Sequence, residues 1–315
     1  WALEGVRYGG DLWGLPAGIS VKMLWYNRAL FDEAGLPYPE ANWSWDDVFL
    51  MARRLSGSER GGQYYGFIIW PDARVIPLFE AVGGPLVVES PASPTFRFDA
   101  PEAVAAAQQL TSLVQDEVVP TPEQSKEYAS QNLFTLIWAN QAGMWAEVAR
   151  GFDDRDFDFH PVPLPQPGRH DFWSSSIYYI AADTPHAEAC WEWLCFLSEH
   201  IPNINDLPPR RSLLTSDTFR EQVGADAQAV YLEALEREER GGLRGLENLP
   251  PYSERAFYTW LEQALGEILW QGADAQATLS QAQQKAEAYL DCLRQRPDLE
   301  DEASAEACFQ GVDTP

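Results

Sequence analysis

The chain has 315 residues, of which 45% are hydrophobic, and its formal net charge is −26. This length exceeds one typical core and predicts two lobes or domains, and the apolar content argues against a disordered chain. So acidic a protein repels nucleic acid and anionic membrane surfaces, so we expect no nucleic-acid partner. No apolar run approaches the roughly 20 residues that span a bilayer.

Helix signals and strand-like runs alternate along the chain. An extended run ends at Met23-Leu24-Trp25-Tyr26-Asn27, and the short helix after it ends at Gly35. Ser44 and Asp99 read as caps at two further helix starts. We expect strands over residues 64–70, 142–145 and 173–182. We expect helices over residues 45–55, 76–82, 99–115, 128–138, 184–200, 215–223, 226–240, 257–271 and 274–293. This alternation predicts an α/β fold.

The four cysteines form two sequence pairs. Cys190 and Cys195 are five residues apart on a predicted helix and point in different directions, so we expect no disulfide between them. Cys292 and Cys308 flank an acidic segment with little core of its own. A disulfide there would pin this segment and fit an oxidising compartment, and free thiols are the alternative. No histidine stands at ligand spacing with a cysteine, so we expect no metal and no cofactor.

Several short motifs follow one another in an order typical of a known family. They are Gly14-Leu15-Pro16, Trp25-Tyr26-Asn27-Arg28, Phe31-Asp32-Glu33-Ala34-Gly35-Leu36-Pro37, Ser44-Trp45-Asp46-Asp47, Gly66-Phe67, Gly83-Gly84, Ala142-Gly143-Met144 and Gln271-Gly272. Each motif alone is weak, but their order and spacing over residues 8–293 are specific. In this respect the chain resembles the extracellular solute-binding proteins, the family that includes the maltose-binding protein.

The resemblance implies a periplasmic-binding-protein-like fold of the class II type, with two α/β lobes, a hinge and a ligand cleft between the lobes. Residues 1–173 would form most of the second lobe, and residues 174–246 would return to the first. Residues 247–296 would supply the final helices of the second lobe, followed by an acidic tail over 297–315. The family carries a further segment, with the export signal, before this one. We therefore expect a truncated chain with an incomplete first lobe.

The same resemblance implies a function in transport. We expect a monomeric, extracytoplasmic substrate-binding component of an ABC importer, periplasmic or anchored at the cell surface as a lipoprotein. It would capture a carbohydrate or polyol and deliver it to the permease subunits. The alternatives are a secreted carbohydrate-active hydrolase and a ligand-sensing module for a membrane receptor. No Gly-x-Ser-x-Gly, His-Glu-x-x-His or phosphate-binding glycine motif is present, so we expect no enzyme.

Sugar sites combine aromatic rings, which stack on pyranose faces, with planar polar groups that bond neighbouring hydroxyls. The chain has 13 Trp, and most of them would belong to the cores. By position relative to the family motifs, we expect ligand contacts from Trp70, Asp72, Glu147, Arg150, Trp173, Ser174, Arg211, Tyr258 and Trp260. Of the aromatic residues, Trp173 is the leading candidate because it stands at the hinge that the resemblance implies.

Each candidate also has a structural interpretation. Trp70 could pack at the end of a strand, and Asp72 could cap the following helix. Only one of Tyr258 and Trp260 would face the ligand while the other packs. Arg211 could be a solvent-exposed charge.

The segment around Glu147 departs from the family pattern. The family usually has Gly where Val148 stands and an aromatic residue where Arg150 stands. Arg150 could replace an aromatic platform with a charged donor, or Trp145 or Phe152 could supply the platform. Alternatively, Glu147 and Arg150, three residues apart, could pair with each other.

Overall fold

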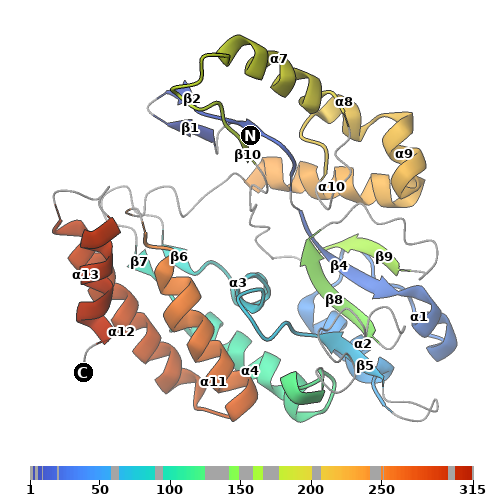
Figure 1. Ribbon diagram of the computed structural model, residues 1–315. Helices are drawn as coiled ribbons and strands as arrows, with labels where there is room; N and C mark the ends of the chain where they lie inside the picture. The colour runs from blue at the N-terminus through green and yellow to red at the C-terminus, as the bar shows by residue number, and fades with distance from the viewer. Residues whose placement is uncertain are drawn as a thin grey trace. The chain divides into compact units, whose positions relative to one another are not determined.

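The structure is a computed structural model of residues 1–315. It describes all residues except 1–2, 4–5, 9, 20, 58–63, 89–94, 125–141, 149–158, 166–176, 201–206, 242–249, 251, 297–301 and 314–315. The chain divides into two compact units. Figure 1 labels the helices and strands of both. Unit 1 comprises Trp1–Trp43, Met144–Pro165 and His170–Leu243; unit 2 comprises Ser44–Gly143, Gln166–Arg169 and Arg244–Pro315. The lobe boundaries that the resemblance implies stay a prediction.

Strands and helices are interspersed as far as β10, as the sequence predicts, and every described element after β10 is a helix. The strands are β1 (Arg7–Tyr8), β2 (Asp11–Leu12), β3 (Leu15–Pro16), β4 (Lys22–Asn27), β5 (Tyr65–Ile68), β6 (Val87–Val88), β7 (Thr95–Phe96), β8 (Ala142–Val148), β9 (Phe159–Pro163) and β10 (Ile177–Tyr178). The helices are α1 (Arg28–Ala34), α2 (Trp45–Leu55), α3 (Val75–Gly83), α4 (Pro101–Gln115), α7 (Ala187–Ser198), α8 (Arg211–Leu214), α9 (Asp217–Val223), α10 (Ala225–Gly241), the π-helix η3 (Phe257–Leu261), α11 (Glu262–Gln271), α12 (Ala275–Arg294) and α13 (Glu302–Asp313).

Strand β4 is the centre of unit 1. It pairs antiparallel with β8 on one side and with β9 on the other. Its residues Met23, Leu24 and Trp25 are all buried, at 0%, 1% and 3% exposure. A strand covered on both faces needs such a continuous apolar run. Helix α1 follows directly and ends at Gly35, whose φ of 63° suits a residue without a Cβ.

Unit 2 is built on helix α2 and strand β5. Ser44 and Asp47 form a capping box: the Ser44 hydroxyl accepts the Asp47 N–H at 3.2 Å, and the Asp47 carboxylate accepts the Ser44 N–H at 2.9 Å. The predicted Ser44 cap is therefore confirmed. Phe49 of α2 meets Phe67 of β5 edge-on at 5.7 Å. This contact joins helix and strand in the core of the unit.

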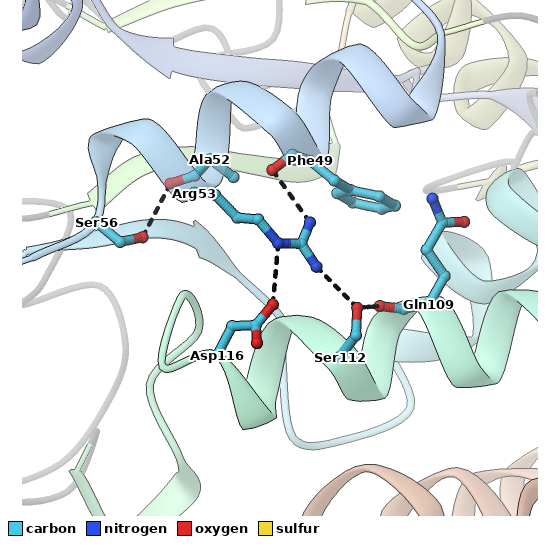
Figure 2. Close-up of polar contacts among 7 residues, drawn as sticks. All are labelled: Phe49, Ala52, Arg53, Ser56, Gln109, Ser112 and Asp116. Atoms are coloured by element: carbon cyan, nitrogen blue, oxygen red, sulfur yellow. Dashed lines mark hydrogen bonds and ion pairs between the residues drawn. The ribbon is translucent and has the colours of Figure 1, made fainter.

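Helix α2 is also tied to α4 through one arginine (Figure 2). Arg53 Nε donates to Asp116 at 3.0 Å and its Nη2 donates to Ser112 Oγ at 2.8 Å. The same guanidinium donates to the Phe49 carbonyl at 3.4 Å. Because the Arg53 and Asp116 side chains are 36% and 52% exposed, the pair contributes less than about 1 kcal/mol. It is a polar link between the two helices.

The start of α4 differs from the prediction. Asp99 does not cap this helix: the N-cap residue is Ala100, without a side-chain bond, and Pro101 occupies the first helical position. Proline fixes the helical φ there and needs no hydrogen-bond partner, so the helix starts without an acidic cap. The Asp99 carboxylate instead accepts a bond from Ser280 of α12 at 3.0 Å.

Two predicted segments fall wholly or partly outside the described residues. The predicted helix over 128–138 lies outside them, and of the predicted strand over 173–182 the structure describes residues 177–182. Within these residues only the short β10 is a strand, antiparallel to β3.

Helix α7 of unit 1 is largely exposed. Leu194 is its one buried residue, while Trp191 and Trp193 are 47% and 58% exposed. Cys190 and Cys195 are free and half-buried. The predicted absence of a disulfide between them matches this geometry.

The segment after α12 contains a packed helix, α13. The structure joins Cys292 of α12 to Cys308 of α13 in a disulfide, with Cα atoms 5.7 Å apart. Ala305 and Cys308 are each 2% exposed. The acidic tail therefore packs on α12 and η3 through its few apolar residues.

Candidate functional site

The loop that leaves β5 carries two of the predicted ligand residues. Trp70 is 3% exposed. Asp72 lies in the turn before α3, where its carbonyl accepts the Val75 N–H at 2.9 Å and its carboxylate accepts the Arg74 N–H at 3.0 Å. The short acidic side chain thus closes its own backbone turn. Asp72 does not cap α3, since the N-cap residue is Arg74 and no side chain caps this helix.

Arg74 covers both of these residues. Its Nε and Nη2 donate to the two carboxylate oxygens of Asp72 at 2.8 and 2.6 Å. Its Cζ lies 3.9 Å from the centroid of the Trp70 ring, the geometry of a cation–π contact. The hydrogen bond from Arg74 lowers the pKa of Asp72. Sequence reasoning missed Arg74, although its position two residues after Asp72 was a weak signal.

The turn η3 carries the other two described aromatic candidates. Trp260 is 3% exposed and lies between Tyr289, met edge-on at 5.4 Å, and Phe309, stacked at 5.3 Å. Tyr258 is 39% exposed. Trp260 is therefore packed and Tyr258 is partly exposed, while the ligand contact of Tyr258 stays a prediction. A single π-helical turn is rare and often marks a functional position.

Charge connects this turn to the loop after β5. Burial raises the pKa of Glu262, and the carboxylate of Asp72 raises it further. Burial also raises the pKa of Tyr258, followed by the charges of Glu254 and Glu262. Helix α11, which begins at Glu262, contacts α3, which begins directly after Arg74. Glu262 was missed by sequence reasoning; its only signal was its place four residues after Tyr258.

We call Trp70, Asp72, Arg74, Tyr258 and Glu262 the loop–helix site. All five belong to unit 2. The site offers a half-exposed phenol, two carboxylates as acceptors and a guanidinium as donor. Such a set can bond neighbouring hydroxyls while an aromatic ring covers an apolar face. These are the requirements of a polyhydroxylated ligand.

The remaining predicted ligand residues lie elsewhere. Glu147 belongs to β8, where its backbone pairs with Met23. Arg211 opens α8 in unit 1 and is exposed. The other three predicted ligand residues lie outside the described residues: Arg150, Trp173 and Ser174.

Neither a metal centre nor a membrane-spanning helix is found in the part of the chain that the structure describes. In those residues, no group of three or more His, Cys, Asp or Glu side chains could hold a metal ion. Among the helices described, none is both long and apolar enough to cross a membrane.

The decisive comparison is with protein families. The model of the bacterial extracellular solute-binding proteins matches residues 2–200. The chain belongs to this family. The resemblance found in the sequence is thereby confirmed, and this extracellular family implies a location outside the cytoplasm. Its members are binding proteins.

A curated relative supports a short part of the same match. A putative binding protein of Brucella abortus (strain 2308) is 38% identical over 58 residues. The aligned part covers 18% of this chain and 13% of that protein, so it spans far less than two thirds of the relative.

Solved structures show the fold. An ABC substrate-binding protein from Listeria monocytogenes, in complex with cycloalternan, has a TM-score of 0.72 and 20% identity, and the match covers 90% of this chain and 73% of that one. An ABC transporter solute-binding protein from Agrobacterium vitis, with bound D-mannitol, has a TM-score of 0.69 and 20% identity, covering 92% and 75%. The predicted periplasmic-binding-protein-like fold is therefore confirmed. These two neighbours were solved with a sugar and a polyol bound, cycloalternan and D-mannitol.

Proposed function

We propose that the protein is the substrate-binding component of an ABC importer for a carbohydrate or polyol. It captures this ligand in the cleft that the family fold implies and delivers it to the membrane permease. The observation that carries the proposal is the loop–helix site, where the 39% exposed Tyr258 lies in the field of Glu262, and Glu262 in turn lies in the field of Asp72. The family match and the neighbours solved with cycloalternan and D-mannitol support it.

Each residue of the loop–helix site has a role in this proposal. The ring of Tyr258 stacks on the apolar face of the ligand, and Glu262 accepts hydrogen bonds from hydroxyls. A carboxylate has about four acceptor positions, so Asp72 can bind a hydroxyl while it keeps its pair with Arg74. The ring of Trp70 is covered by Arg74, so it can stack on a ligand only after that side chain moves.

The other predicted contacts stay predictions. Glu147, Arg150, Trp173, Ser174 and Arg211 would complete the ligand shell. In the proposed mechanism the ligand binds the closed state of the two lobes more tightly than the open state. Its binding therefore shifts the population toward the closed state, which the permease recognises.

A hydrolase is the second candidate, because the site holds two carboxylates whose pKa values are shifted in opposite directions. The pKa of Asp72 is lowered by Arg74, while the pKa of Glu262 is raised by burial. Glycosidases use one carboxyl group kept protonated and one kept ionised. The family consists of binding proteins, so we favour capture over cleavage.

Calorimetry with maltose, D-mannitol and cycloalternan tests the proposal. We expect one of these ligands to bind and to raise the free energy of unfolding by about 2.7 kcal/mol at a hundredfold excess over Kd. Tyr258→Ala should then weaken binding by about tenfold. Trp191→Ala is the matched control, since Trp191 is also an exposed aromatic residue, at 47% against 39% for Tyr258, and lies on α7 in unit 1.

Two outcomes would oppose this function. Release of reducing ends from maltose by the wild-type chain would support the hydrolase instead. Equal affinity of the Tyr258→Ala and Trp191→Ala variants would remove Tyr258 from the site.

A further inference from the structure

Helix α13 packs on the π-helical turn η3. Phe309 of α13 stacks on Trp260 of η3, with ring centroids 5.3 Å apart and ring planes 21° apart. Tyr289 of α12 meets both rings edge-on, at 5.4 Å from Trp260 and 6.1 Å from Phe309. Trp260 and Tyr289 are almost fully buried. Three rings from three elements therefore fix the inner side of η3.

A charged contact joins the same elements just before η3. Arg255 Nη1 donates to Glu306 of α13 at 2.6 Å, and Glu302 lies 3.7 Å from its Nη2. The Arg255 side chain is only 28% exposed, so solvent and salt screen this pair less than an open surface pair. Its Cζ also lies 5.8 Å from the Phe309 ring. Helix α13 thus holds the turn at its entry as well as at its centre.

The chain enters this region through a strained residue. Tyr252 has a φ of 67°, in the left-handed region that non-glycine residues seldom adopt. Its carbonyl accepts the Tyr289 hydroxyl at 3.2 Å and the Arg255 N–H at 3.2 Å. Such a conformation persists only where the surrounding contacts over-determine it, and it concentrates at functional sites.

The disulfide anchors α13 beside these contacts. Cys308, which is 2% exposed, directly precedes Phe309, and its partner Cys292 lies on α12. The bridge therefore limits how far Phe309 can move from Tyr289. Because residues two apart on a helix point in nearly opposite directions, fixing Trp260 inward also fixes Tyr258 outward.

We propose that α13 is a positioning clamp for Tyr258. Phe309 and Glu306, anchored by the Cys292–Cys308 bridge, hold η3 in the conformation that presents Tyr258 to the ligand. Both are positioning residues, since they act through Trp260 and Arg255 and not by touching the ligand. The inference rests on the proposed function for the ligand contact of Tyr258, but the holding of η3 can be measured without any ligand.

Hydrogen exchange of the ligand-free chain tests the clamp itself. Phe309→Ala removes the stack, and Phe196→Ala, at a 48% exposed position on α7, is the matched control. We expect the amides of η3 to exchange about tenfold faster or more in Phe309→Ala, with those of α4 unchanged. The control should alter neither element. Unchanged exchange in η3, or equal acceleration in α4, would overturn the proposal.

A double-mutant cycle then tests whether the clamp acts through Tyr258. Affinities for maltose, D-mannitol and cycloalternan are measured for Phe309→Ala, Tyr258→Ala and the double variant. We expect Phe309→Ala to weaken binding about fivefold or more in the wild-type background and to have no further effect beside Tyr258→Ala. Phe309→Tyr, which keeps the ring, should restore the affinity.

Two results separate this inference from the proposed function. An equal loss of affinity in both backgrounds would mean that Phe309 acts on general stability, and the clamp would be rejected. If none of the three sugars binds the wild type, the proposed function fails for them, while the exchange experiment still decides whether α13 holds η3.

Discussion

The guanidinium of Arg74 lies over the indole of Trp70, with its Cζ 3.9 Å from the ring centroid. The same guanidinium bonds both carboxylate oxygens of Asp72. One guanidinium therefore contacts both Trp70 and Asp72, two residues that the sequence predicted as ligand contacts. The lowered pKa of Asp72 is the electrostatic consequence of this pairing.

Replacing this cation should destabilise the fold modestly. Arg74→Leu removes the contact with Trp70 and the pair with Asp72; the side chains of Arg74 and Asp72 are 41% and 46% exposed. Since solvent screens such a pair, we expect a loss of about 1 kcal/mol in the free energy of unfolding, most of it from the ring contact. Urea unfolding at neutral pH measures it.

Arg220→Leu provides the control for the Arg74 variant. Arg220 pairs with Asp217 on the open surface of α9, with 53% and 80% exposure, and it should contribute less than about 0.5 kcal/mol. Equal losses from the two variants would contradict a special role for the Trp70 contact.

Asp72 and Glu262 should give stability opposite pH dependences. The folded-state pKa of Asp72 is lowered, so its stabilisation is present above the unfolded value of about 3.9 and is lost as the pH falls through the folded value. The folded-state pKa of Glu262 is raised by burial and by Asp72, so stability is lost as the pH rises from about 4.3 through the folded value. Asp72→Asn should therefore be destabilising at neutral pH, and Glu262→Gln stabilising.

Urea unfolding between about pH 3 and pH 8 checks both signs. Each variant should approach the wild type as the medium becomes acid, because both wild-type carboxyl groups are then protonated. A cost of Asp72→Asn that grows on acidification would show that the pairing with Arg74 does not stabilise the folded state.

Much of the fold was predictable where the signals are local. Ser44 begins α2 and Gly35 ends α1, each through hydrogen bonds to residues a few positions away in sequence. Both predictions were confirmed. Asp99 failed because its carboxylate bonds Ser280, 181 residues away in sequence. No local pattern carries such a contact, and Pro101 made a cap unnecessary.

In the candidate site, too, the features that depend on residues distant in sequence could not be predicted. The sequence named Tyr258 and Trp260 as a pair but could not choose between them. That choice depends on Phe309 and Tyr289, which bury one of the two rings. Glu262 was missed for a related reason. Its pKa is raised by burial and by the carboxylate of Asp72, which is distant in sequence.

Removing the disulfide should lower the free energy of unfolding more than removing the two free thiols. The bridged cysteines are 16 residues apart, and closing such a loop stabilises by about 3 kcal/mol in the chain-entropy account. The Cys292→Ala/Cys308→Ala variant should lose about this much in urea unfolding. Cys190→Ala/Cys195→Ala, at the half-buried free thiols of α7, should lose less than about 1 kcal/mol. Similar losses would mean that the bridge adds nothing to stability.

Gly66 should tolerate no side chain. It lies on β5 against α2, where a Cβ would stand 1.7 Å from the carbonyl oxygen and 2.7 Å from the Cα of Ala52. These are backbone atoms of a helix and cannot rotate away, so Gly66→Ala must push α2 off the strand. We expect a loss of about 3 kcal/mol or more, or failure to fold.

Gly266 of α11 is the matched comparison, since a Cβ added there would meet no atom within 4 Å. There alanine restricts the unfolded chain and favours the helix, so Gly266→Ala should gain about 0.5–1 kcal/mol. Urea unfolding should show a lower free energy of unfolding for Gly66→Ala and a higher one for Gly266→Ala. A mild Gly66→Ala variant would show that α2 and β5 can separate at little cost. The Gly66-Phe67 motif would then need a reason other than the close approach of helix and strand.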